Sequence, residues 1–241
     1  MRGDQLGFVT VSRKSANSWH LVEFRWLFLA SYLYAKLAPL QHCRAGHAKV
    51  FSPPFTMQII WGFDPLDRGH CSILFSPEDV PLKPAEFPNS LVSYARYPKR
   101  SLQFRREWIL PTHLELNNAK PVLWKTDEYR NLVDQLNSDG KPGQLIHRIG
   151  GYPQEAQGDM QLECQLVTHG LYCGNQSGYQ DPRRTELEKG ASDWRLVAQF
   201  DSDEAGLSWM WGDVGRVYFW ARKQDIEAAD FGKSWAILQC G

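Results

Sequence analysis

The sequence has no excess of charge of either sign, since Lys plus Arg and Asp plus Glu each total 27 of its 241 residues. A domain that binds nucleic acid normally carries a basic excess or a basic face. We interpret the one basic cluster as a solvated strand edge and its turn, with a phosphate-contacting patch as the alternative; it comprises Arg96, Lys99, Arg100, Arg105 and Arg106. The charge balance therefore argues against a nucleic-acid-binding protein.

Long apolar runs are also absent. The most apolar segment, Trp26 to Ala35, is too short for a bilayer, which needs about 20 apolar residues. It follows a polar stretch containing Glu23, too deep in the chain for a signal peptide. We therefore expect no membrane partner and no secretory leader.

Cysteine is scarce and irregularly spaced. An odd count without regular spacing argues against a disulfide framework. The five cysteines are Cys43, Cys71, Cys164, Cys173 and Cys240. We therefore predict a reducing, cytoplasmic setting.

Metal-binding spacings are poor. His42-Cys43-x3-His47 with His70-Cys71, and Cys164-x4-His169-x3-Cys173, contain zinc-ligand types but lack the paired C-x2-C spacing. The acidic run from Asp201 to Glu204 lacks the later glycine and glutamate of an EF-hand loop, and is interpreted as a solvated turn. We expect no metal and no other cofactor.

No catalytic motif stands out, because Gly-x-Ser-x-Gly and the glycine-rich phosphate loops do not occur. Cys164 or Cys240 would form a dyad with His147 if the fold brought them together. Buried structural cysteine is the preferred interpretation.

Aromatic residues are abundant, at 13% with ten tryptophans, and they favour pleated, half-buried surfaces. Prolines at 81, 84, 88, 98 and 111 suit short strands joined by loops. The predicted strands are residues 57–61, 70–76, 91–97, 102–110, 194–201 and a closing strand over 234–240. On the strand over 194–201 we place Leu196, Ala198 and Phe200 on one face.

One helix is clearly predicted, from a Thr126 cap with Asp127 and Glu128 in the first turn, where the helix dipole favours negative charge. Its apolar residues repeat at helical spacing. Residues 223–231 suggest a second, short helix or turn, and residues 170–193 a long polar surface loop.

The stretch WMWGDVGRVYF, Trp209 to Phe219, predicts a hairpin whose strands, 207–211 and 216–221, flank the turn Gly-Asp-Val-Gly. The preferred interpretation is a packing hairpin; the alternative is a recognition surface, since Trp and Arg often dominate binding energy at interfaces. Of the two indoles, Trp211 is the better core candidate and Trp209 the better contact candidate. The partner-binding candidates are Trp209, Trp211, Asp213, Arg216, Asp201 and Asp203.

A second turn is predicted at RIGGYP, where Gly150 and Gly151 allow a tight backbone and Tyr152 with Pro153 stiffens the exit. His147 is expected to hydrogen-bond a neighbouring loop rather than to act in catalysis.

The fold class expected from these elements is α+β, mostly antiparallel sheet, as a single domain over 1–241 with residues 1–23 partly disordered. Similarity between LFLASY (27–32) and RLVAQF (195–200) suggests an internal duplication, with halves at 24–120 and 144–241 packed together.

From about Phe55 onward the chain resembles the YwqG-like family of bacterial proteins. The resemblance is carried by HRIGGYPQEAQGDM, LVAQFDSDEAGLSWMWGDVGRVYFW and DFGKSWAILQC. The Gln-Asp-Ser-Asp and Trp-Gly-Asp-x-Gly-Arg pattern also resembles the C-terminal domain of programmed cell death proteins, which are linked to handling a ribosomal protein. YwqG-type relatives near secreted-toxin genes suggest immunity proteins, and the family that the chain resembles has no established enzymatic activity.

The function we expect is therefore binding of an unidentified protein partner without catalysis, in an immunity-like or chaperone-like role. The alternative is a hydrolase or transferase with a Cys/His or Asp-based site in a cleft between the two halves.

Overall fold

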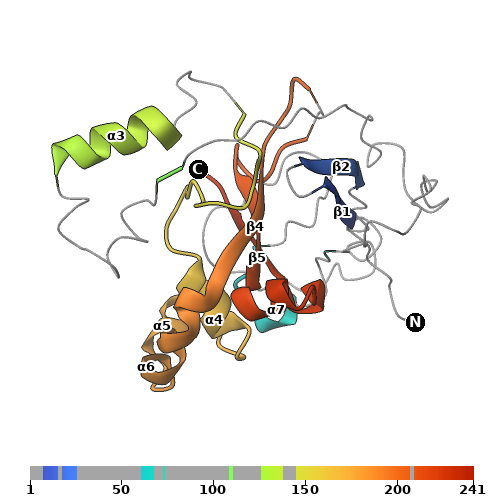
Figure 1. The fold of residues 1–241 in the computed structure, drawn as a ribbon. Coiled ribbons are helices and arrows are strands. Elements are labelled where there is room, and N and C mark those ends of the chain that lie inside the picture. Colours follow the sequence, from blue (N-terminus) through green and yellow to red (C-terminus); the bar gives the residue numbers. More distant parts are fainter. Residues whose placement is uncertain are drawn as a thin grey trace, which may run out of the picture.

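The computed structural model describes residues 8–15, 18–25, 61–67, 73, 109–110, 126–137, 145–206 and 209–241. Its centre is an antiparallel sheet of four strands in the order β3-β4-β5-β6. The strands are β3 (Arg148–Ile149), β4 (Trp194–Asp201), β5 (Arg216–Arg222) and β6 (Trp235–Gln239). The helices over 161–193 and 223–227 lie at one end of this sheet (Figure 1), and the helix over 127–137 lies elsewhere, so the α+β class is confirmed. No helix in the described ranges is long and apolar enough to span a bilayer.

The predicted strands over 194–201, 216–221 and 234–240 are confirmed as β4, β5 and β6. The prediction for the faces of β4 is wrong, because the register with β5 shifts between Leu196 and Ala198. Leu196 therefore packs in one cluster, and Ala198 and Phe200 pack in the other, on the opposite face. A β-bulge adds a residue to one strand and reverses the alternation beyond it.

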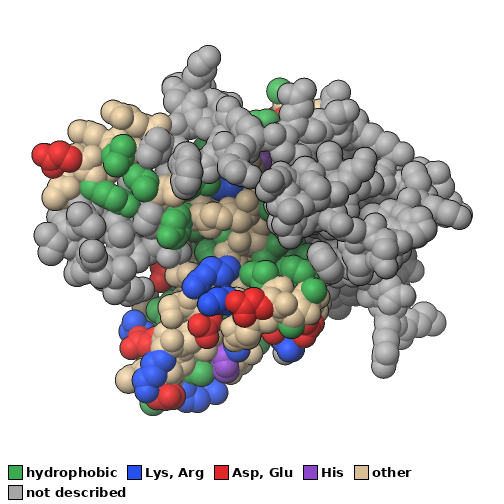
Figure 2. Space-filling view, viewed as in Figure 1, with side chains coloured by type: hydrophobic (Ala, Val, Ile, Leu, Met, Phe, Trp, Pro, Cys, Tyr) green, Lys and Arg blue, Asp and Glu red, His purple; other side chains and the backbone are tan. Residues whose placement is uncertain are grey.

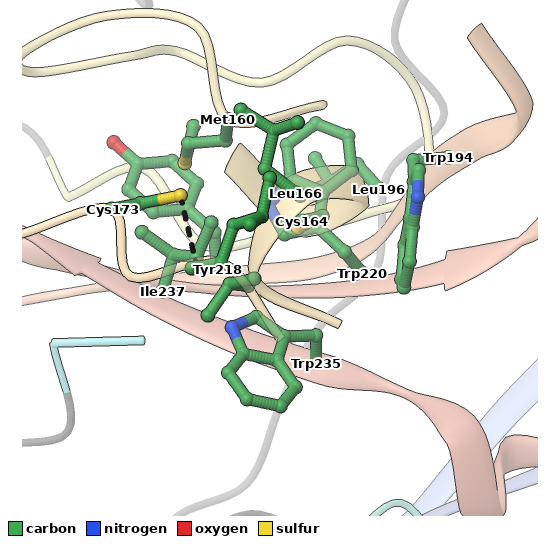
Figure 3. Close-up of a cluster of buried hydrophobic side chains, with 12 residues drawn as sticks. Met160, Cys164, Leu166, Cys173, Trp194, Leu196, Tyr218, Trp220, Trp235 and Ile237 are labelled. Carbon is green, nitrogen blue, oxygen red and sulfur yellow. Dashed lines mark hydrogen bonds between the residues drawn. The ribbon is translucent and has the colours of Figure 1, made fainter. Parts of the chain in front are cut away.

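Two hydrophobic clusters cover the two faces of the sheet. Cluster 1 contains Trp194, Leu196, Tyr218, Trp220 and Ile237 from the sheet, and Met160, Cys164 and Leu166 from α4 and the residue before it (Figure 3). Cluster 2 contains Ala198, Phe200, Val217, Phe219, Ala236 and Leu238, together with Ile73, Trp209 and Trp211. Burial on both faces explains why these strands are nearly continuous in apolar residues.

Short helices form where the sequence suggested a loop. The chain from Met160 onward contains α4 (Gln161–Val167), α5 (Gln176–Gln180), α6 (Arg184–Leu187) and the 3-10 helix η4 (Glu188–Asp193). The loop prediction for 170–193 is therefore wrong. A capping residue in this range could have predicted a helix. The Asn175 side chain accepts a hydrogen bond from Ser177 N at 2.8 Å, which satisfies a free N–H donor in the first turn of α5.

The two predicted helices are present. The first is α3 (Asp127–Asn137), where Thr126 Oγ1 accepts from Tyr129 N at 3.3 Å. The second is α7 (Lys223–Glu227), followed by the 3-10 helix η5 (Phe231–Lys233). An antiparallel hairpin, β1 (Phe8–Ser15) with β2 (Ser18–Arg25), occupies the segment where the sequence suggested partial disorder.

The segment after Ile60 lies against the edge of the sheet. Leu238 N donates to Trp61 O at 3.2 Å, and Trp235 Nε1 donates to Gly62 O. Gly62 has φ +80°, and a Cβ there would lie 2.1 Å from Ala236 O, so only glycine fits. The 3-10 helix η1 (Pro65–Asp67) follows. The predicted strands at 57–60, at 70–76 apart from Ile73, at 91–97 and at 102–108 lie outside the described residues.

Candidate functional site

The connection between β4 and β5 is the most elaborate turn in the described structure. We call its described residues, 202–206 and 209–215, the extension (Figure 1). Asp203 and Trp209 form one isolated antiparallel bridge, with backbone hydrogen bonds of 3.0 and 3.2 Å in the two directions. Of the predicted strand over 207–211, residues 207 and 208 lie outside the described residues. Over 209–211 a single bridge at Trp209 replaces a regular ladder.

Buried polar side chains hold the base of the extension. Asp201 Oδ2 accepts from Ile146 N at 3.0 Å, and its Oδ1 accepts from Ser202 N and pairs with Arg216 Nε at 3.1 Å. Ser202 Oγ donates to Gly215 O at 2.8 Å and accepts from Trp211 N at 2.9 Å. Buried groups with satisfied partners fix a loop more strictly than apolar contact does.

Both indoles of the extension are buried, with Trp209 at 5% and Trp211 at 3% exposure. Their rings lie 5.6 Å apart, and Trp209 Nε1 donates to Asp201 O at 2.9 Å. The burial of both indoles agrees with the preferred packing-hairpin interpretation, and it leaves Trp209, the better contact candidate of the two, without an exposed ring. An indole with its N–H bonded internally and its ring against a second indole is a structural anchor.

The tip of the extension is the exposed part. Gly215 N donates to Trp211 O at 2.7 Å, which closes the turn, and Asp213 and Val214 face solvent. Val214 is 66% exposed and has φ +52°. A β-branched residue in the left-handed region is a genuine conformational outlier. Of the six candidates, Asp213 alone is fully exposed, Arg216 is partly exposed, and the other four are buried.

His147 approaches the base of the extension. Its Nδ1 accepts from Asp201 N at 3.2 Å, and its ring lies 6.3 Å edge-on from Trp209. Burial lowers the pKa of His147, while the charges of Asp201 and Asp203 oppose that shift. The ring is thereby kept as a neutral acceptor, in the hydrogen-bonding role that the sequence suggested.

The Gly-Gly turn leads into a segment that crosses one face of the sheet. Gly150 and Gly151 have φ +66° and +76°, and a Cβ at Gly151 would meet Ile109 Cδ1 at 3.1 Å. Arg148 Nη1 donates to Tyr152 O at 3.1 Å. This conformation favours glycine at both positions. We call residues 152–158, which follow the turn, the strap.

Two buried glutamines clamp the strap. Gln199 Oε1 accepts from Gln154 N at 3.0 Å, while Gln239 Oε1 accepts from Ala156 N and Gln157 N, both at 3.0 Å. Tyr218 OH donates to Gln154 O at 2.6 Å, and burial raises the pKa of Tyr218 to about 12. The sequence analysis assigned these glutamines no role. The sequence pattern could have indicated them, because each is an amide within a strand of mostly apolar residues, and a buried amide requires hydrogen-bond partners.

The pair of Cys164 with His147 considered from the sequence is not assembled. Cys164 is fully buried in cluster 1, whereas His147 contacts Phe200 and Trp209 of cluster 2. His169 Nδ1 lies 2.5 Å from Gln165 O. Within the described ranges, no three side chains of His, Cys, Asp or Glu are grouped to hold a metal; His42, Cys43, His47, His70 and Cys71 lie outside them.

Charges on the described surface are mixed. Figure 2 shows basic and acidic side chains interspersed over the helical end of the molecule. Several are paired, as Arg183–Asp181, Arg184–Glu188, Lys189–Glu186 and Lys223–Glu227. Exposed pairs of this kind contribute little stability, and their alternation creates no single-sign field over that end. The cluster from Arg96 to Arg106 lies outside the described residues.

The chain matches the family described as "Domain of unknown function (DUF1963)" over residues 28–240. No curated protein matches it. The matched range includes the β3–β6 sheet, the strap and the extension, and the chain belongs to this family.

Proposed function

We propose that this member of the DUF1963 family is a non-catalytic module that binds a protein partner through the tip of the extension. Asp213 and Val214 are the proposed contact residues. Trp209, Trp211, Asp201, Asp203 and Arg216 hold the tip in place, which changes their role from the one suggested by the sequence.

The observation that carries this proposal is the conformation of Val214. Its left-handed backbone costs about 1–3 kcal/mol, and such strain persists only where the surroundings enforce it. The neighbouring contacts do enforce it: Gly241 N donates to Asp213 O at 3.1 Å, and Gly215 packs against Gln239 O. An apolar side chain presented in this way is preorganised for binding, which reduces the entropy lost on association.

A catalytic role receives less support from the described residues. Cys164 and Cys240 are buried, and burial raises the pKa of Cys173 to about 12. The thiolate is the nucleophile, so a thiol with this pKa is a poor one at neutral pH. The hydrolase or transferase alternative therefore needs groups beyond these cysteines.

The test is affinity capture from a lysate of the source organism, with three variants matched for folding. Val214→Asn keeps a residue that tolerates the left-handed region and removes the apolar contact. Leu66→Asn is the control, because Leu66 is also an exposed apolar residue, at 82%, but lies in η1. Asp213→Asn removes the charge at the tip.

We expect Val214→Asn to reduce capture of the partner by about tenfold, near 1.4 kcal/mol, with a melting temperature equal to or above that of the wild type. Leu66→Asn should capture normally. If Val214→Asn and Asp213→Asn capture as much partner as Leu66→Asn does, the tip is not the contact surface. A partner identified in this way is then titrated against purified protein to give dissociation constants.

The finer assignments are part of the same proposal. The motifs over 147–160 and 196–220 support the YwqG-like resemblance and, with it, the immunity-like or chaperone-like role. The similarity of residues 27–32 to residues 195–200 supports the internal duplication. The three described cysteines, Cys164, Cys173 and Cys240, are free thiols. Free thiols suit a reducing compartment, which supports a cytoplasmic location.

A further inference from the structure

The face of the sheet beneath the strap carries polar side chains from all four strands. Strand register places Arg148, Gln199 and Tyr218 side by side in one row. Arg216 and Gln239 are paired in the next row on the same face, because residues two apart in a strand point the same way. These five side chains form a polar surface at the end of the sheet that the strap crosses, and we call them the strap site.

The strap site binds the main chain of the strap. Its hydrogen bonds are Arg148 Nη1 to Tyr152 O at 3.1 Å, Gln154 N to Gln199 Oε1 at 3.0 Å, Tyr218 OH and Arg216 Nη1 to Gln154 O at 2.6 and 3.3 Å, Ala156 N and Gln157 N to Gln239 Oε1 at 3.0 Å each, and Gln239 Nε2 to Gly158 O at 3.0 Å. The Gln157 side chain adds a bond from its Nε2 to Cys240 O. Every bond from the strap site thus goes to a group that any extended peptide offers, apart from the N–H that proline lacks.

One side chain of the strap fits this site imperfectly. The Gln154 Oε1 atom is buried and has no hydrogen-bond partner among the described residues. A buried acceptor without a partner has lost its water and gained nothing in return. The outer side of the strap is open, since Ala156 and Gln157 are both exposed. The strap therefore lies at the surface and carries a cost that another peptide would avoid.

Glycines stand at both ends of the strap. Gly150 and Gly151 precede it with φ of +66° and +76°, and Gly158 ends it. A Cβ added at Gly150 or Gly158 would meet nothing within 4 Å. Hinges are a few residues that absorb a change of backbone angles, and glycine does so with the least steric restriction. The chain is therefore able to bend at both ends of the strap.

We propose that the strap site is a binding site for an extended peptide segment of a partner protein, and that the strap occupies it as an internal competitor. When the strap lifts, the main chain of the partner segment takes its place on the same side chains. The strap lowers the apparent affinity in proportion to the fraction of molecules in which it is lifted. The strap site is separate from Asp213 and Val214, so this proposal does not rest on the proposed function.

The experiment measures binding of a peptide with the strap's own sequence, Tyr-Pro-Gln-Glu-Ala-Gln-Gly, blocked at its C-terminus and carrying a fluorophore at its N-terminus. Its fluorescence anisotropy is followed during titration with the full chain. Ala156→Pro removes the N–H that Gln239 binds, and so weakens the strap without altering the strap site. Ala156→Ser is the matched control, because it keeps that N–H at the same exposed position.

We expect Ala156→Pro to bind the peptide about tenfold more tightly than the wild type, because its strap is lifted more often. Ala156→Ser should bind like the wild type. A folded Ala156→Pro protein that binds the peptide no better than Ala156→Ser does would overturn the proposal.

Two altered peptides test how the site recognises its ligand. N-methylation of the nitrogens that correspond to Ala156 and Gln157 removes both donors to Gln239, and should weaken binding by about tenfold. Leucine in place of Gln154 should bind at least as tightly as the original sequence, since it buries no unpaired oxygen. Equal binding of the methylated and unmethylated peptides would show that the strap site does not recognise main-chain donors.

A second measurement needs no variant and covers the case in which Ala156→Pro does not fold. Hydrogen exchange of the wild type is followed by mass spectrometry with and without excess unlabelled peptide. A ligand that binds only the lifted state raises its population, so exchange at the strap's own amides should become about threefold faster or more, with β5 unchanged. Unchanged exchange at the strap amides would show that the peptide does not compete for this site, and would disprove the proposal.

Discussion

The extension connects β4 to β5, and the α4–α5 junction lies in the connection between β3 and β4. Different kinds of contact hold these two connections against the sheet. The extension is fixed by Asp201 and Ser202, which bond to backbone groups that would otherwise be buried without partners. The junction relies on apolar packing in cluster 1, which includes Cys164 and Leu166 of α4, with Tyr179 of α5 packed against it. The comparison shows that buried hydrogen bonds hold the base of a strained tip such as Val214, whereas apolar packing holds the helices of the junction.

The largest expected effect is removal of an indole from the extension. Trp209→Ala and Trp211→Ala should each cost about 3–5 kcal/mol of unfolding free energy, as truncations of buried aromatics do. Chemical denaturation with both variants checks this. If Trp209→Ala keeps wild-type stability, the extension is held by its polar contacts alone, and the anchoring role given to that indole is wrong.

A slightly smaller loss is expected when the polar anchor is removed. Asp201→Ala leaves Arg216, whose side chain is 21% exposed, without its ion pair, and Ile146 N without its acceptor. Breaking such a pair costs about 3 kcal/mol. The matched control is Asp213→Ala, an exposed aspartate in the same extension, which should change stability by less than about 0.5 kcal/mol. Equal melting temperatures for the two variants would contradict this contrast.

Variants at the two glycines of the Gly-Gly turn separate the cost of a strained backbone from the cost of a steric contact. Gly151→Val should cost about 1–3 kcal/mol, because valine disfavours positive φ. Gly150 has a similar φ of +66° but no atom within 4 Å of an added Cβ, so Gly150→Val reports the backbone term alone. Thermal denaturation of both variants should show the larger loss at Gly151, where Ile109 must also move. A Gly151→Val protein that melts within about a degree of the wild type would refute the turn interpretation.

The smallest expected effect is the response of the extension to acid. Because burial lowers the pKa of His147 below 6.5, the folded state favours the neutral ring. The stability that this contributes is present above pH 6.5 and is lost as the pH falls through the lowered value. The extension is thus expected to weaken in acid.

Thermal melts of His147→Gln and wild type between pH 7 and 5 test whether His147 causes a loss of stability in acid. Glutamine still offers an acceptor to Asp201 N but does not ionise. The variant should therefore lose less stability than the wild type over that interval. Parallel curves would show that His147 does not contribute to the acid response.

Some of this structure was predictable because its signals are local. The cap of α3 by Thr126, the strands β4 to β6 and the need for glycine at 150 and 151 each depend on a few neighbouring residues. The bulge after Leu196 and the single bridge at Trp209 were missed, since both depend on register with another strand. The aromatic pattern suggested a packing hairpin, but it did not show that Trp209 is buried as fully as Trp211, because alternation alone does not reveal which side is covered.

The sequence by itself determined the α+β class, the order of the C-terminal elements and the absence of a charge excess, because propensity, periodicity and composition are properties of short segments or of the whole count. Only the tertiary structure decided what the distinctive residues do. It brings Asp201 to Ile146 and Gln239 to the strap across more than 50 residues of chain. These roles arise from desolvation and from hydrogen bonds between distant segments, which no local pattern encodes.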